Sequence, residues 1–135
     1  MCVFTHFAAG AVVSAFAPHP ALVPVFALGS HIILDMIPHF DFENMSIEIV
    51  LGLIALAGLL LGGVYSLSII LGGIIAALPD LENLFVKTGK IAENRKIFPS
   101  HSGILPHGRK AGLLNLSMQS LLSIMVLGFL IWRAA

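Results

Sequence analysis

The chain has 135 residues, of which 58% are hydrophobic and only 10% are charged, and its mean hydropathy is +1.00. A soluble domain carries about 25% charged residues, so this composition excludes a globular protein with a fully water-facing surface. The formal net charge is +0, and the single cysteine, Cys2, excludes an intramolecular disulfide. We therefore expect one integral-membrane domain over residues 1–135.

Apolar segments separated by prolines, glycines and polar residues predict an all-α, polytopic membrane bundle of about five short helices. The predicted helices cover residues 4–17, 21–37, 46–61, 66–78 and 111–132, with one polar loop over 80–110. Pro38 and Pro79 are expected to end the second and fourth helices, because proline breaks a helix interior. A perpendicular crossing of the bilayer needs about 20 residues, so only the last helix is long enough without tilting, thinning or extension.

The basic residues predict an orientation in the membrane. No Lys or Arg precedes Lys87, and six of the seven lie in the 80–110 loop. The positive-inside rule therefore places that loop in the cytoplasm, together with the 38–46 loop and the N-terminus. Acidic residues share the loop with the basic ones, so we expect membrane lipids as partners and no nucleic acid.

An imidazole and a carboxylate lie inside the second apolar segment, at His31 and Asp35. Their i, i+4 spacing places both on one face of a helix. Burial in apolar surroundings penalises both groups, and a divalent metal offsets both penalties because it binds a neutral imidazole and a carboxylate. The alternative is a buried His–Asp hydrogen bond that holds two helices together.

Six further residues with ligating side chains fall on the same, cytoplasmic side of the predicted topology. They are His6, His39, Asp41, Asp80, His101 and His107. We expect His31 and Asp35 as core metal ligands, completed by His6, His39 and Asp80, with Asp41 as a bridging ligand or a brace. His101 and His107 are expected as catalytic residues, either as ligands or as the donor of a proton to the leaving group. Eight candidates exceed the four ligands of a single zinc site, which indicates two ions or separate catalytic groups.

Four short motifs carry a resemblance to a known family. They are Thr5-His6-Phe7-Ala8-Ala9-Gly10, the run from Ser30-His31 to Pro38-His39-Phe40-Asp41, Leu78-Pro79-Asp80, and the loop with His101 and His107. Together they resemble small bacterial integral-membrane proteins described as membrane-bound metal-dependent hydrolases, and more distantly zinc-dependent phospholipases C. The resemblance implies a multi-pass protein of the bacterial inner (cytoplasmic) membrane. It also implies metal-site roles for His6, His31, Asp35, His39, Asp80, His101 and His107.

The chain departs from that family at two motifs. The aspartate-rich Leu-Pro-Asp-x-Asp-His run is split, since His39 stands where the first Asp would be and no His follows Leu78-Pro79-Asp80-Leu81-Glu82. A looser pair, His101 and His107, replaces the His-Arg-Gly-x-Thr-His loop. Both departures bear on catalysis more than on metal binding.

The expected activity is hydrolysis of a phosphoester or ester in a lipid-like substrate, with a divalent metal as cofactor: zinc first, manganese or magnesium as alternatives. One rival is a non-catalytic membrane protein held together by a structural metal or a polar His/Asp cluster. Another is a small ion transporter subunit, since intramembrane His and Asp are typical of ion pathways. A transporter would distribute such groups through the membrane depth, whereas here they gather at one side.

Overall fold

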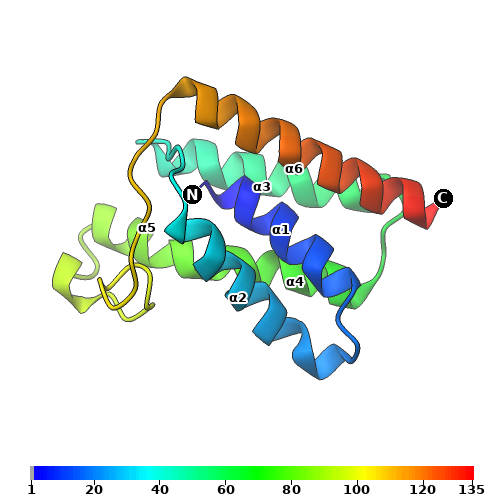
Figure 1. Cartoon of the computed structure of the whole chain (residues 1–135), viewed down its shortest axis with the longest axis horizontal. Coiled ribbons are helices and arrows are strands. Elements are labelled where there is room, and N and C mark those ends of the chain that lie inside the picture. Colours follow the sequence, from blue (N-terminus) through cyan, green and yellow to red (C-terminus); the bar gives the residue numbers. More distant parts are fainter. Residues whose placement is uncertain (1) are drawn as a thin grey trace.

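The computed structural model describes residues 2–135, and over that range it is all-helical, with no strand (Figure 1). The α-helices are α1 (Val3–Ala15), α2 (Val23–Met36), α3 (Met45–Leu61), α4 (Leu67–Ala77), α5 (Leu81–Lys87) and α6 (Leu113–Ala134). Three 3₁₀ turns, η1 (Pro20–Leu22), η2 (Leu78–Asp80) and η3 (Glu93–Arg95), connect them. The all-helical fold class is therefore confirmed.

Helix α1 occupies the middle of the bundle and contacts α2, α3, α4 and α6 (Figure 1). Helices α1, α3 and α6 run in one direction, and α2 and α4 run in the other (Figure 1). The beginning of α1 and the ends of α2 and α4 therefore meet at one end of the molecule. The opposite end holds the turn between α1 and α2, where His19 accepts a hydrogen bond from the Ala21 amide on its Nδ1.

Small residues allow α1 and α4 to cross at very short range. A side chain at Gly10 would collide with Ala76 and with the backbone of Gly72, and one at Gly72 would collide with Ser14. Close backbone contact through small residues is a common way to pack helices that lack a strong hydrophobic driving force between them. This crossing holds the first turn of α1 beside the end of α4.

The structure differs from the sequence prediction at Pro79. The helical path continues through η2 into α5, so the first eight residues of the predicted 80–110 loop, as far as Lys87, are helical. Pro79 occupies an early position of a new helical turn, where its fixed φ suits the helix and its missing N–H is not needed. The predicted second helix also divides, with η1 preceding α2. The remaining helix boundaries agree with the prediction to within about two residues.

Within residues 2–135, two helical stretches are long and apolar enough to cross a membrane: Leu67–Lys87, which joins α4 to α5, and Leu113–Ala134, which is α6. Helices α1, α2 and α3 are apolar but shorter. Only 17% of the most apolar window of α6 is buried inside the protein, whereas a core helix of a soluble protein is mostly buried. The structure thus contains two candidate spans rather than the five that the composition predicts.

Candidate metal centre

Helix α2 presents His31 and Asp35 from successive turns at the end of the molecule where the helix termini meet. Both side chains are fully buried, and His31 Nε2 lies 3.0 Å from Asp35 Oδ2. The other ring nitrogen of His31, Nδ1, lies 2.7 Å from the carbonyl oxygen of Ala76 on α4. A ring that donates its Nδ1–H to a carbonyl keeps Nε2 unprotonated, and this is the form that binds a metal. The α2–α4 contact therefore leaves His31 Nε2 as the ring nitrogen that could bind a metal ion.

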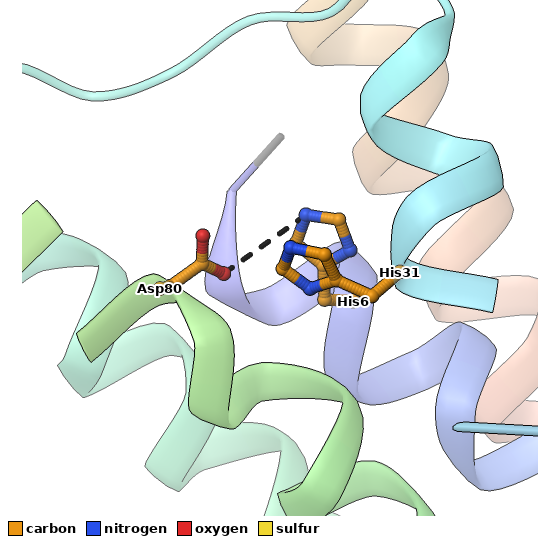
Figure 2. A group of neighbouring side chains, drawn as sticks. All are labelled: His6, His31 and Asp80. Atoms are coloured by element: carbon orange, nitrogen blue, oxygen red, sulfur yellow. Dashed lines mark ion pairs between the residues drawn. The ribbon is translucent and has the colours of Figure 1, made fainter. Parts of the chain in front are cut away.

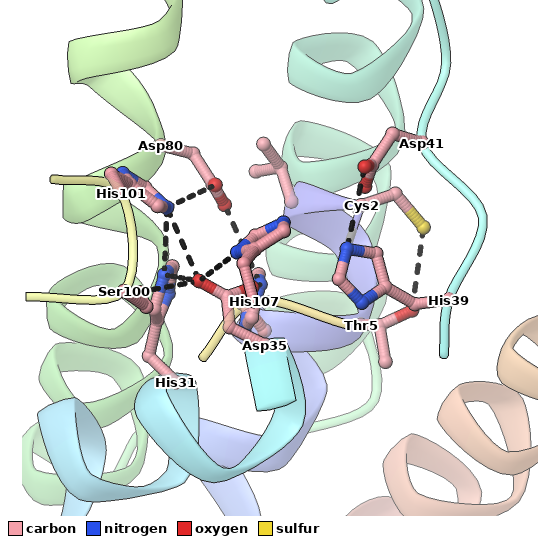
Figure 3. A network of polar contacts seen from close by, with 12 residues as sticks. Cys2, Thr5, His31, Asp35, His39, Asp41, Asp80, Ser100, His101 and His107 are labelled. Carbon is pink, nitrogen blue, oxygen red and sulfur yellow. Dashed lines mark hydrogen bonds and ion pairs between the residues drawn. The ribbon is translucent and has the colours of Figure 1, made fainter. Parts of the chain in front are cut away.

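The loop between α5 and α6 brings His101 to the same point (Figure 3). His101 Nε2 lies 3.4 Å from His31 Nε2 and 3.2 Å from Asp35 Oδ2. Four ligands arranged tetrahedrally around zinc at about 2.0–2.2 Å lie roughly 3.3–3.6 Å from one another. The three separations, 3.0, 3.2 and 3.4 Å, lie at or slightly below that range. His31, Asp35 and His101 could thus hold one metal ion together.

His6 from α1 and Asp80 from η2 lie beside His31 (Figure 2). His6 Nε2 is 3.1 Å from Asp35 Oδ1 and 3.9 Å from Asp80 Oδ2, while Asp80 Oδ1 is 3.8 Å from His101 Nε2. Both carboxylates therefore direct one oxygen toward His6 and the other toward His101. The ring of His6 also stacks on that of His31, with centroids 3.7 Å apart. Two adjoining sets of side chains that share two carboxylates could hold two ions.

Four buried polar atoms in this cluster accept or donate no hydrogen bond within the described part of the chain. They are His6 Nδ1, His39 Nε2, Asp80 Oδ2 and His101 Nδ1. Leaving a buried polar atom unsatisfied costs about 1–3 kcal/mol, and more for a charged group. A divalent cation held by the Asp80 carboxylate would remove that cost, so the residues present fit a metal ion.

His39, Asp41 and His107 form the other side of the cluster. His39 Nδ1 lies 2.7 Å from the Ile37 carbonyl, which leaves Nε2 directed at Asp41 Oδ2, 3.3 Å away. Burial raises the pKa of the Asp41 carboxyl, but contact with the His39 imidazole lowers it, and the net pKa lies well below its usual range. His107 Nδ1 is 3.8 Å from Asp35 Oδ2. Burial lowers the pKa of His107 despite the nearby Asp35 charge.

Three polar residues that the sequence analysis did not select support the cluster. Ser100 donates a hydrogen bond of 2.7 Å to Asp35 Oδ2 (Figure 3). Glu82 accepts two backbone amides of the loop before Ser100, at 3.0 Å each, and its other oxygen lies 3.5 Å from His101 Nδ1. Glu48 on α3 accepts a backbone amide just after Asp41, at 2.9 Å. The only signal for these residues in the sequence is the adjacency of Ser100 to His101.

Backbone hydrogen bonds attach the His101–His107 loop to the end of α2. The Gly108 amide donates to the Asp35 carbonyl at 2.6 Å, and the Ala111 amide donates to the His39 carbonyl at 2.8 Å. A side chain at Gly108 would collide with the carbonyl of Ile37, so only glycine permits this approach. The structure thus brings all eight sequence-predicted site residues to one end of the bundle and leaves His19 at the other.

A cavity of about 490 Å³ opens over the cluster. Asp80, His101 and His107 form part of its wall, and Lys87, Lys96 and Lys110 also line it. A molecule in this cavity would contact the cluster directly.

Comparison of the chain with protein families, with curated proteins and with solved structures returned no match. The relationship to the membrane-bound metal-dependent hydrolases therefore stays a prediction. Any function assigned to the chain has to rest on the geometry of its own residues.

Proposed function

We propose that the protein is a membrane-bound hydrolase that uses one or two divalent metal ions to cleave a phosphoester or carboxylic ester of a lipid-like substrate. The observation that carries the proposal is the spacing of His31 Nε2, His101 Nε2 and Asp35 Oδ2, which lie 3.0–3.4 Å apart in a buried site. The neighbouring His6 and Asp80 supply donors for a second ion. Imidazole nitrogen and carboxylate oxygen together favour zinc, with manganese as the next choice.

The residues divide into those that hold metal and those that face the cavity. A divalent ion bound here lowers the pKa of a water molecule and polarises the scissile group. The side chain of His101 is only 2% exposed and lies within the ligand trio, so we assign it to metal binding rather than to proton transfer. The side chain of His107 is 39% exposed at the cavity wall, which suits a group that protonates the leaving oxygen. Asp41 contacts Nε2 of the His39 ring at 3.3 Å and so orients it.

The location that we propose is the cytoplasmic face of a bacterial inner membrane. The two candidate spans support membrane association, and the lysines around the cavity support a cytoplasmic orientation by the positive-inside rule. In this arrangement the cluster lies at the membrane–water interface, where an ester bond of a lipid is accessible.

Metal content tests the proposal most directly. The wild type, purified in detergent without chelators, is expected to carry about one or two ions per chain by mass spectrometry, and His31→Ala and Asp35→Ala are expected to lose them. His19→Ala, at the other end of the bundle, is the control and should keep its metal. The metal-loaded wild type should hydrolyse bis-p-nitrophenyl phosphate or a p-nitrophenyl ester. A wild type that takes up neither zinc nor manganese would exclude the hydrolase function.

A structural role for the same cluster is the second candidate, and one observation favours it. His31 and Asp35 connect α2 to α4, to α1 and to the loop before α6 through contacts of 2.7–3.1 Å. A purely structural metal predicts that chelation unfolds the protein and that His107→Ala has no effect. The hydrolase proposal predicts that His107→Ala keeps its metal and its melting temperature but loses at least about tenfold in turnover.

A further inference from the structure

An apolar groove of about 200 Å³ lies next to the metal centre, between α1, α3, α4 and α5. Phe7 from α1, Ile49 and Gly52 from α3, Ile74 from α4 and Leu84 from α5 line it. Its walls are almost entirely hydrocarbon, with Asp80 as the one charged residue. The groove therefore suits an alkyl chain and offers no partner to a polar group except at the Asp80 end.

The groove and the polar cavity share two lining residues, Met45 and Asp80. Asp80 lies 3.8 Å from His101 and 3.9 Å from His6, so the shared end of the groove is at the metal cluster. A molecule that extended from one hollow into the other would place its junction beside the proposed ligands.

The sides of the groove continue into exposed apolar residues. Leu53, Leu78 and Leu81 line the groove and are 60%, 48% and 38% exposed. Leu78 and Leu81 belong to the Leu67–Lys87 stretch, which is long and apolar enough to lie in a membrane. An alkyl chain could therefore enter sideways from the bilayer without crossing water.

The polar cavity carries side chains of both charges. Lys87, Lys96 and Lys110 line it, the Lys87 ammonium donates to the Glu43 backbone carbonyl at 2.8 Å, and Lys96 pairs with Glu93. Five carboxylates also line it: those of Asp41, Glu43, Glu48, Asp80 and Glu93. Binding of a negatively charged head group would therefore depend on the metal ions of the proposed function as well as on the lysines. Metal ions at the cluster would offset the charges of Asp35 and Asp80. Lysine ammonium groups and metal ions both attract phosphate oxygens.

We infer that the groove binds the hydrocarbon chain of an amphiphile whose phosphate-like head group occupies the polar cavity, so that the ester bond lies beside Asp80 and His101. The inference rests on the proposed function, because it identifies that amphiphile as the substrate. A second copy of this chain is the competing occupant of the groove.

Binding of alkylphosphonates tests the inference separately from turnover, since hydrolysis does not cleave their C–P bond. Methylphosphonate and dodecylphosphonate are titrated by calorimetry into the zinc-loaded full chain in detergent. Each methylene that leaves water for the groove tightens binding about fourfold. Part of this gain is lost to partitioning into detergent, so variants in the same detergent provide the comparison.

Gly52→Leu places a side chain in the groove, and Gly58→Leu makes the same change two turns later in α3, where the position is exposed and a side chain meets nothing. We expect Gly52→Leu to bind dodecylphosphonate at least tenfold more weakly than the wild type, with unchanged zinc content and methylphosphonate affinity. Gly58→Leu should match the wild type throughout. Leu84→Trp, from the opposite wall, should reproduce the effect and replaces Gly52→Leu if that variant does not fold.

The outcomes separate the inference from the proposed function. The wild type could hydrolyse p-nitrophenyl esters while neither Gly52→Leu nor Leu84→Trp changed dodecylphosphonate binding. That result would support the proposed hydrolase function and refute the groove as the binding site of the alkyl chain. Phosphonate binding that required zinc and tightened with alkyl-chain length, but came with no hydrolysis of any ester, would support the groove as an amphiphile site. It would refute the proposed hydrolase function. Equal dodecylphosphonate affinity with a change from dimer to monomer in Gly52→Leu would assign the groove to a second copy of the chain, against the inference.

Discussion

Replacing Ser100 by alanine tests whether the cluster is preorganised for metal. The Ser100 hydroxyl is buried and donates a hydrogen bond of 2.7 Å to Asp35 Oδ2, the carboxylate oxygen that also faces His31 and His101. A hydrogen bond to a charged group contributes about 1.5–3 kcal/mol, and 1.4 kcal/mol corresponds to a tenfold change in affinity. Groups that brace metal ligands in this way change metal affinity by about 10- to 100-fold.

The structure indicates the lower half of that range. Asp35 keeps its contacts with three histidines when the hydroxyl is removed, so the carboxylate loses one of several restraints. We therefore expect Ser100→Ala to bind zinc about 10- to 30-fold more weakly than the wild type. The matched control is Ser102→Ala, two residues further along the same loop, whose hydroxyl is exposed and faces only a backbone carbonyl at 3.5 Å.

Zinc affinity is measured by competition with a chromophoric chelator, and circular dichroism confirms that the helices of each variant are intact. Ser102→Ala should bind zinc as the wild type does. If Ser100→Ala stayed within threefold of the wild type, Asp35 would not be a metal ligand that this hydroxyl positions, and the assignment of the trio would be refuted.

Three further changes test the packing and the chemistry of the cluster. Gly108→Ala should weaken zinc binding and lower the melting temperature, because a methyl group there collides with the end of α2 and overpacking costs about 1–3 kcal/mol. The control is Gly112→Ala, where the added methyl group meets nothing, and it should change neither zinc binding nor the melting temperature. Gly72→Val should separate α1 from α4, with a loss of at least about 3 kcal/mol of stability in chemical denaturation, while Gly58→Val should cost less than about 1 kcal/mol. Zinc affinity should fall as the pH is lowered in equilibrium dialysis, because protons compete with the metal for imidazole nitrogens and carboxylate oxygens. A zinc affinity that rose as the pH was lowered would exclude these ligands.

The sequence predicted much of the cluster because its key residues lie at helix ends. His31 and Asp35 share a helix face by spacing alone, and the alternation of helix direction brings His6 and Asp80 to the same side. The loop that carries His101 had only to connect two helices at that side. These placements follow from helix order and require no knowledge of side-chain packing.

Other features were not predictable because they depend on contacts between distant segments. Pro79 lies at a helical turn that continues, and only the structure shows that the chain needs no N–H at that position. In the sequence, Gly10 and Gly72 do not differ from other glycines of apolar segments. Only the contact between α1 and α4 shows that a larger side chain would not fit at either position. Ser100 and Glu82 do not lie at a sequence spacing from the histidines that is typical of metal sites. Their contacts with Asp35 and His101 are seen only in the folded structure, where the loop packs against α2. Local patterns thus predict which groups gather, while tertiary packing decides how each is held.

The position of the His101–His107 loop between α5 and α6 has a consequence for biosynthesis. Nearly three quarters of the chain, including His6, His31, Asp35 and Asp80, leaves the ribosome before His101 does. The loop is held in place on its far side by α6, which packs against α1 and α3 and is made after them. The nascent chain therefore holds an incomplete set of candidate ligands until α6 has been made and packed. Under the proposed function, capture of a metal ion would follow the synthesis of α6, and a truncation before α6 would leave the site without the helix that holds its loop.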